Sequence, residues 1–192
     1  MRNNKLFCIL GKSASGKSAI LNEVLSKLDI PVLLSNTTRE PRANEIDGKD
    51  YNFVTMSTFD SDYKNEDVLE YDCYRIDSIK QTWVYYTKKS DLLVPTTSQI
   101  KIVSPTGLAQ LMSNKELRDN IVSIYIDADD KLRQKRYLSR CISPDNMSDR
   151  FSRDEKTFQH LFTDYIILND ENMSIHEASN QLINIIEREL NC

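Results

Sequence analysis

Glycine is scarce in this chain, with only four among 192 residues. Glycine is the residue that adopts left-handed backbone angles, and allows close approach to the backbone, without strain. A chain that uses it so sparingly places it where the backbone needs it. Two of the four, Gly11 and Gly16, stand close together near the N-terminus, and this spacing marks the first candidate site.

The sequence also lacks a long apolar run. No window approaches the roughly 18 apolar residues that a membrane-spanning helix requires. The apolar run before Gly11 is too short for the core of a secretion signal. We therefore expect a cytoplasmic protein that does not insert into a membrane.

An excess of positive charge is absent as well. Lysine and arginine number 25 against 29 aspartates and glutamates, which gives a formal net charge of −4. This balance argues against a protein that coats nucleic acid or an anionic membrane surface. It leaves room for a local basic site that binds a small anion.

Patterns typical of metal binding are missing too. The four cysteines are scattered, and no two of them form a C-x-x-C pair. The two histidines, His160 and His176, are too far apart in sequence and context to suggest a shared metal site. Reduced thiols, as in a cytosolic protein, are the expected state of the cysteines.

The apolar residues that are present predict an α/β fold. A buried strand is expected at 5–10, a helix with apolar residues at helical spacing from Ser18 onward, and a second buried strand at 32–35 after Pro31. Strand, helix and strand within about thirty residues favour a parallel sheet.

The pattern of residue types changes between residues 36 and 95. Tyrosine, threonine, valine and phenylalanine cluster in "YNFVT", "CYRI" and "WVYYT", which predicts short antiparallel strands in an inserted lobe. Core elements then return. Strands are expected at 100–104, 121–126 and 165–170, and helices at 105–112, 129–140, 148–161 and 175–190.

The segment "GKSASGKS" (Gly11–Ser18) fits the pattern G-x-x-x-x-G-K-[ST] in full. Such a loop between a strand and a helix turns successive backbone N–H groups toward phosphate oxygens. Lys17 would reach the β and γ phosphates, and the Ser18 hydroxyl would take a place on Mg²⁺. The predicted nucleotide-binding residues are Gly11, Lys12, Ser13, Ala14, Ser15, Gly16, Lys17 and Ser18.

A second candidate anion site lies in "SNTTREPRANEIDGKDYNFV" (Ser35–Val54). Arg39 and Arg42 flank a proline, and Tyr51 follows. Arginine holds a phosphate with a fixed fork of donors, and tyrosine adds a hydroxyl. Taken alone, such a pair is more often a solvated surface feature.

This stretch closely resembles the GMP-binding signature of guanylate kinases, roughly S-x-T-T-R-x-P-R-x-x-E-x-x-G-x-D-Y-x-F-V. "VLEYD", "YYT", "RYLSR" and "DYIILND" resemble further family motifs, so the likeness covers most of the chain. The matching signature residues are Ser35, Thr37, Thr38, Arg39, Pro41, Arg42, Glu45, Gly48, Asp50, Tyr51, Phe53 and Val54.

The resemblance implies a P-loop NTPase-type three-layer fold with a parallel core sheet. Residues 1–35 and 96–192 would form the kinase core, with a helical lid at about 136–155. Residues 36–95 would form a small inserted mixed β lobe for the acceptor nucleotide. The implied reaction is phosphoryl transfer from ATP to GMP or dGMP with Mg²⁺, by a monomer or homodimer.

The resemblance also implies roles for individual residues. A carboxylate suits the N1–H and N2–H₂ groups of guanine, and a hydroxyl suits its O6. The implied acceptor-phosphate residues are Arg39, Arg42, Tyr51 and Tyr85, with Glu45 beside them in the signature, and the implied base readers are Ser35, Glu70, Thr87 and Ser104. The implied catalytic residues are Lys17, Arg39, Arg136, Arg140 and Arg150, and Asn169 would face the adenine of ATP.

The sequence departs from the family pattern at several points. Ile102 and Ser104 stand where the family has two aspartates, one near the metal and phosphates and one near guanine. Tyr86 replaces a glycine, the lid is one residue shorter, and the inserted lobe is remodelled.

Two other functions remain open at this stage. The first is a P-loop kinase for another nucleoside monophosphate or a phosphorylated sugar, which the missing aspartate at Ser104 favours. The second is a non-catalytic binding module, against which the intact Lys17 and Ser18 argue.

Overall fold

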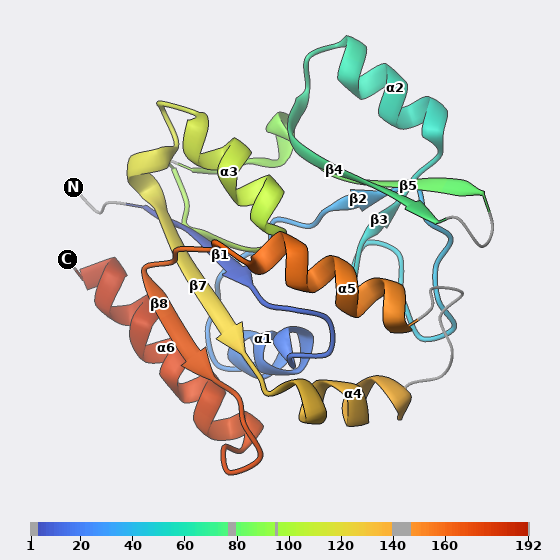
Figure 1. Ribbon diagram of the computed structural model, residues 1–192. Coiled ribbons are helices and arrows are strands. Elements are labelled where there is room, and N and C mark those ends of the chain that lie inside the picture. Colours follow the sequence, from blue (N-terminus) through green and yellow to red (C-terminus); the bar gives the residue numbers. More distant parts are fainter. Residues whose placement is uncertain (1–3, 77–79, 95, 140–146, 192) are drawn as a thin grey trace.

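The computed structural model describes residues 4–76, 80–94, 96–139 and 147–191. The predicted α/β class with a parallel core sheet is confirmed. Four parallel strands form the core sheet in the order β6-β1-β7-β8 (Figure 1). Their bounds are β1 (Leu6–Leu10), β6 (Gln99–Ile102), β7 (Ile121–Asp127) and β8 (Tyr165–Leu168).

Helices cover both faces of this sheet, so the predicted three layers are present. Helices α1 (Lys17–Leu25) and α6 (Ile175–Asn191) lie side by side on one face and pack on Phe7 and Ile9 (Figure 1). Helix α3 (Pro105–Ser113) and the end of α5 (Met147–Phe158) pack on the face that carries Leu6 and Cys8. Every residue of β1 is therefore buried, as expected of a central parallel strand.

The helix starts follow from local sequence. The Ser104 side chain accepts a hydrogen bond from the Gly107 N–H, and the predicted Pro105 occupies the first turn of α3. Asp129 caps α4 (Asp130–Leu138), so this helix begins where the sequence predicted a helix from residue 129. Short 3₁₀ turns occupy Lys89–Asp91 and Arg118–Asn120.

The strand predicted at 32–35 is wrong. Only one isolated bridge forms there, between Val32 and Ile100 on the outer side of β6. By Ser35 the backbone already pairs with a different sheet, because the Ser35 carbonyl accepts a hydrogen bond from the Asn52 N–H at 3.1 Å. The segment crosses from one sheet to the other and is too short to form a ladder with both.

The inserted residues form a second, mixed sheet in the order β3-β2-β5-β4. Strands β2 and β3 run parallel, whereas β2–β5 and β4–β5 are antiparallel, so the expectation of antiparallel strands alone is wrong for the first pair. The bounds are β2 (Asn36–Thr37), β3 (Asn52–Phe53), β4 (Val68–Ile76) and β5 (Gln81–Lys88).

The sequence reading missed helix α2 (Met56–Lys64), which lies beyond this second sheet (Figure 1). Its sequence is mostly polar and none of its residues is buried, so it carries little helical periodicity. The Phe59 ring contacts Tyr86, with ring centroids 5.0 Å apart. Tyr86, which replaces a family glycine, thus faces α2. No helix in the described ranges is long and apolar enough to cross a bilayer.

Candidate active site

The loop Gly11–Ser18 joins β1 to α1, the context that the phosphate-loop motif requires. Gly16 has φ 99°, in the left-handed region that disfavours side chains. A Cβ on Gly11 would lie 2.7 Å from the Ile126 carbonyl oxygen. Both glycines are therefore required by the path of the loop.

Lys17 bends back over the loop. Its ammonium Nζ donates hydrogen bonds to the carbonyls of Gly11, at 2.5 Å, and Lys12, at 3.1 Å. Ser18 is exposed in the first turn of α1. Both side chains line the cavity described below, so a phosphate held by this loop would lie within reach of both.

The Ser15 carbonyl is anchored from behind the loop. Asn169, fully buried after β8, donates from Nδ2 to this oxygen at 2.7 Å. Arg136 donates to it from Nη1 at 3.3 Å. The adenine contact expected of Asn169 stays a prediction, because the structure places its amide against the loop backbone.

Arg133 is the largest fully buried side chain of the described residues, and the sequence reading missed it. Its Nε donates to the Ser13 carbonyl at 3.0 Å and its Nη2 to Asp154 Oδ2 at 2.8 Å. The same Asp154 oxygen accepts the Ser13 N–H at 2.7 Å. Lys12 also contacts Glu155 at 2.6 Å. These contacts dock α5 against the phosphate loop.

The arginine cluster consists of Arg39, Arg42, Glu45, Tyr51 and Tyr85. Arg39 is buried and forms a forked pair with both Glu45 oxygens at 2.9 Å. Its Nε donates to the Tyr85 hydroxyl at 2.9 Å. Burial acts to lower the pKa of Arg39, but its hydrogen bonds to Glu45 and Tyr85 and the charges of those two groups together outweigh burial and raise that pKa.

Arg42 differs from Arg39 in its unused donors. Its backbone N–H donates to Glu45 at 2.8 Å. Its Nε and Nη2 atoms are buried, and neither finds a partner among the described residues. Burial, together with the charges of Arg150 and Arg39, lowers the pKa of Arg42. Buried N–H groups without acceptors amid positive charge form a site prepared for an anion.

Tyr51 lies edge-on to Tyr85, with ring centroids 5.8 Å apart. Burial first, and then the neighbouring Tyr85, raise the pKa of Tyr51 to about 12. Its hydroxyl therefore keeps its proton at neutral pH and can donate it to an anion beside Arg42.

The lysine cluster consists of Ser35, Glu70, Thr87 and Lys101. Glu70 on β4 faces Thr87 on β5, and the Thr87 hydroxyl donates to Glu70 Oε1 at 2.6 Å. Lys101 on β6 contacts the other three side chains. The sequence predicted Ser35, Glu70 and Thr87 but missed Lys101, although a lysine inside the apolar run "IKIV" was a visible signal.

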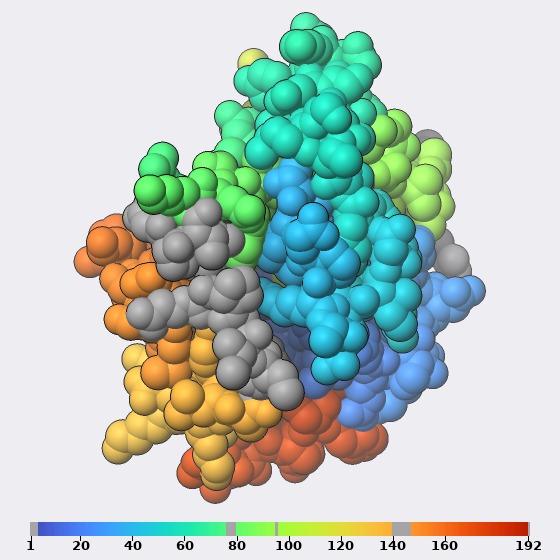
Figure 2. Space-filling model, turned by 90° about the vertical axis from the view of Figure 1, so that its right-hand side faces the viewer, coloured from blue at the N-terminus to red at the C-terminus, as the bar shows by residue number. Residues whose placement is uncertain are grey.

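One cavity of about 440 Å³ brings the loop and both clusters together. It lies between the core sheet and the second sheet, whose residues stand above the core in Figure 2 (cyan to green) with α6 (red) at the base. Predicted site residues that line it are Gly11, Ser13, Ala14, Lys17, Ser18, Ser35, Arg42, Glu45, Tyr51, Glu70, Tyr85, Ser104 and Arg150.

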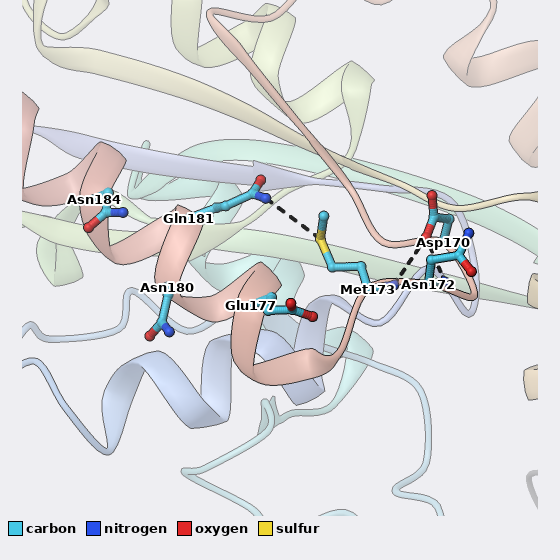
Figure 3. A pocket seen from close by; sticks show the side chains of 7 residues that line it. All are labelled: Asp170, Asn172, Met173, Glu177, Asn180, Gln181 and Asn184. Atoms are coloured by element: carbon cyan, nitrogen blue, oxygen red, sulfur yellow. Dashed lines mark hydrogen bonds between the residues drawn. The ribbon is translucent and has the colours of Figure 1, made fainter.

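A second hollow of about 420 Å³ lies along α6 and the turn before it (Figure 3). Its acidic groups serve the local backbone: Asp170 accepts the Asn172 N–H at 2.8 Å, and Glu177 accepts the Ser174 N–H at 2.8 Å. Of the residues that the structure describes, no lysine or arginine lines this hollow. It therefore offers no counter-charge for a phosphate, and the site lies in the first cavity.

Comparisons with known proteins agree with this geometry. The sequence model of one family, described as guanylate kinase, matches residues 3–189. The chain belongs to the guanylate kinase family. It is 28% identical over 186 residues to a guanylate kinase of Fusobacterium nucleatum, covering 95% of each chain. It is 25% identical over 193 residues to one of Clostridium tetani, covering 98% of this chain and 88% of the relative.

The same fold occurs in a solved member of the guanylate kinase family. The crystal structure of guanylate kinase from Anaplasma phagocytophilum superposes with a TM-score of 0.65 at 21% identity. The superposition covers 99% of this chain and 88% of that one.

Two departures from the guanylate kinase pattern find a structural explanation. Ser104, which replaces an aspartate, caps α3, and serine and aspartate cap helices about equally well. Ile102 is a partly buried member of the core. In the described ranges no cluster of histidine, cysteine or acidic residues could hold a metal ion by itself.

The predicted lid can be followed only in part. Helix α4 ends at Leu138 and α5 begins at Met147, so Arg140 lies outside the described residues. Arg150 on α5 lines the cavity and its charge acts on Arg42.

We expect Gly16→Ala to destabilise the fold more than Gly48→Ala. Both glycines have positive φ, 99° and 73°, so each change costs about 1 kcal/mol or more in backbone strain. At Gly48 the new Cβ meets nothing within 4 Å, whereas at Gly16 it would lie 2.3 Å from Asn169 Nδ2. Displacing that amide breaks its bond to Ser15, which adds about 1 kcal/mol. Equal urea midpoints for the two variants would contradict this account.

Arg133→Met should cost on the order of 3 kcal/mol of unfolding free energy, because it leaves the mostly buried Asp154 carboxylate without its cation. The matched control is Lys131→Met on the exposed face of the same helix, which should change stability by less than about 0.5 kcal/mol. Urea unfolding of both variants measures the difference. A small loss for Arg133→Met would mean that the buried pair does not hold α5 in place.

Proposed function

We propose that this chain transfers the γ-phosphoryl group of ATP to GMP or dGMP, giving ADP and the nucleoside diphosphate. The observation that carries the proposal is the pairing of two anion sites in one cavity. The phosphate loop with Lys17 lies on the core side, and the unpartnered donors of Arg42 lie in the loop between β2 and β3. A bisubstrate phosphoryl transfer needs two phosphates held in line.

The acceptor phosphate would bind at the arginine cluster. Arg42 offers Nε and Nη2 directly, and Tyr51 and Tyr85 add hydroxyl groups from the same wall. Arg39 already donates to Glu45, to Tyr85 and to the Glu40 carbonyl. Arg39 would therefore contact phosphate only by exchanging one of these partners, and Glu45 would serve to orient the two arginines.

The base of the acceptor would bind at the lysine cluster. Glu70 accepts the N–H groups of guanine, and Ser35 lies beside it on the cavity wall. Recognition by paired polar groups rejects a base of the opposite polarity, because the buried protein groups are then left unpaired.

The donor nucleotide and Mg²⁺ would bind at the phosphate loop. The Ser18 hydroxyl is exposed beside the loop and suits a metal ion whose other ligands come from phosphate oxygens and water. Mg²⁺ neutralises charge that develops on the phosphates. This chain contributes the loop N–H groups, Lys17, Arg136 and Arg150 to hold the phosphates, and the route involves no covalent enzyme intermediate.

The proposal includes the division of the chain. Residues 1–35 and 96–192 form the ATP-binding core with a lid at about 136–155, and residues 36–95 form the acceptor lobe. Cytoplasmic location and a monomeric or homodimeric state go with it.

A second candidate is a kinase for another small phosphorylated acceptor. The neutral Ser104, in place of the aspartate of the family pattern, is the observation that favours it. The two candidates differ only in the base or sugar that the lysine cluster accepts.

A Mg²⁺-ATP kinase assay with GMP, dGMP, AMP, CMP, UMP and dTMP in parallel tests the proposal. ADP release should be confined to GMP and dGMP. Turnover with a different acceptor would establish the second candidate, and no turnover with any of them would refute the proposed acceptor class.

Lys17→Ala should lower kcat by about 10²–10³-fold, as for other single donors that face developing charge. GMP affinity, measured by calorimetric titration, should stay nearly unchanged, because Lys17 belongs to the phosphate loop, where its ammonium donates to the carbonyls of Gly11 and Lys12. Lys27→Ala, in the turn just after α1, is the control and should retain full turnover. Wild-type turnover by Lys17→Ala would refute the role of the phosphate loop.

A further inference from the structure

Lys101 is a fully buried lysine in the middle of a core strand. It lies on β6 between Ile100 and Ile102, and its side chain has 0% exposure. Burying an ammonium group is costly unless it is paired and hydrogen-bonded. A lysine at this position must therefore be held by strong local partners.

Within the described part of the chain, the polar contacts of its side chain go to the lysine cluster. The Lys101 Nζ donates to Ser35 Oγ at 2.9 Å and to Thr87 Oγ1, and it lies 3.1 Å from Glu70 Oε1. An ammonium has three N–H groups and no acceptor. Two of the N–H groups of Lys101 therefore serve Ser35 and Thr87, and its charge is paired with Glu70.

These contacts fix the direction of the neighbouring protons. Thr87 accepts from Lys101 and donates its own proton to Glu70 Oε1 at 2.6 Å. Ser35 also accepts from Lys101, so its hydroxyl proton must point elsewhere. Among the described residues nothing accepts that proton, and Ser35 lines the cavity. Ser35 thus presents its O–H donor, with one remaining lone pair, to whatever the cavity holds.

Glu70 presents the complementary acceptor. Its Oε1 is occupied by Lys101 and Thr87, which leaves Oε2. Gly107 makes room for this oxygen, since a Cβ at that position would lie 2.5 Å from Oε2. Glu70 lines the cavity with Ser35, whereas Lys101 and Thr87 lie behind them and are not part of the lining.

We propose that Lys101 is a specificity-determining positioning residue, which makes Ser35 a donor and holds Glu70 as an acceptor toward the acceptor base. A donor beside an acceptor matches the O6 and N1–H edge of a 6-oxopurine. Adenine presents the reverse order, an N6–H₂ donor beside the N1 acceptor. The inference rests on the proposed function and names the residue behind its base selectivity.

The test compares kcat/KM for GMP, IMP and AMP in wild type and in Lys101→Met, which keeps the length of the side chain but removes its donors. Loss of Lys101 frees the lone pair that it occupies, so the Ser35 hydroxyl can turn its proton away from the cavity and present an acceptor instead. The GMP:AMP preference should fall by about tenfold or more, mainly through KM for GMP, while KM for ATP is unchanged. IMP should lose as much as GMP, because it shares the O6 and N1–H edge.

A purely structural role predicts a different pattern, in which all acceptors and ATP lose equally and the GMP:AMP ratio stays constant. That outcome would overturn the proposal. Lys131→Met, exposed on α4, is the matched control and should keep the wild-type ratio. If Lys101→Met does not fold, Lys101→Gln supplies the second variant. Its amide can donate to Ser35 but carries no charge for Glu70, and the GMP:AMP ratio should again fall.

The same experiment separates this inference from the function on which it rests. If the wild-type chain does not phosphorylate GMP, the proposed function fails and the inference falls with it. If the wild-type chain prefers GMP and the Lys101 variants keep that preference, the inference alone is wrong.

Discussion

The candidate site depends on the anchoring of the carbonyl groups in the loop between β1 and α1. Arg133 holds the Ser13 carbonyl, Asn169 and Arg136 hold that of Ser15, and Lys17 holds those of Gly11 and Lys12. Carbonyl and N–H groups of one planar peptide point in opposite directions. Drawing the Ser13 and Ser15 carbonyls toward their donors turns the N–H groups of the same peptides, those of Ala14 and Gly16, the opposite way, and backbone N–H groups released in this manner are what a loop uses to bind phosphate. The anchors come from α4, from the end of β8 and from α1, so the loop is shaped by the fold as a whole.

Contacts of Lys101 join the two sheets. Lys101 belongs to the core sheet, whereas Glu70 and Thr87 belong to the second sheet. The ion pair of Lys101 with Glu70 therefore crosses the boundary between the predicted core and lobe. On β5, Tyr85 and Thr87 are two residues apart and lie on the same face. The arginine and lysine clusters are therefore neighbours on one strand, and a small shift of this strand moves both.

Sequence alone predicted the elements that carry strong periodicity or a motif. The buried strands around Phe7 and Ile124, the phosphate loop and the start of α3 follow from local patterns. The prediction of a strand at 32–35 was wrong because this short segment crosses from the core sheet to the second sheet and forms a ladder with neither. Helix α2 was missed because its sequence is mostly polar and none of its residues is buried, so the apolar residues show little helical periodicity. Arg133 and Lys101 were missed for another reason: their partners lie far away in sequence, and no local pattern records them.

The charges of the cavity suit a nucleoside monophosphate. At the lysine cluster the charges of Glu70 and Lys101 cancel and the nearby Ser104 is neutral, and Asp72, which accepts a hydrogen bond from Tyr74, adds one carboxylate to the cavity lining. At the arginine cluster, Arg39 and Arg42 share the single carboxylate of Glu45, and Arg150 adds a further positive charge. A ligand with an uncharged base and a dianionic phosphate complements both walls. Ser104, in place of the family aspartate expected near guanine, removes one negative charge beside the base and keeps the cap of α3. Under the proposed function, hydrogen-bond direction then sets the polarity of the base site, and that direction depends on Lys101.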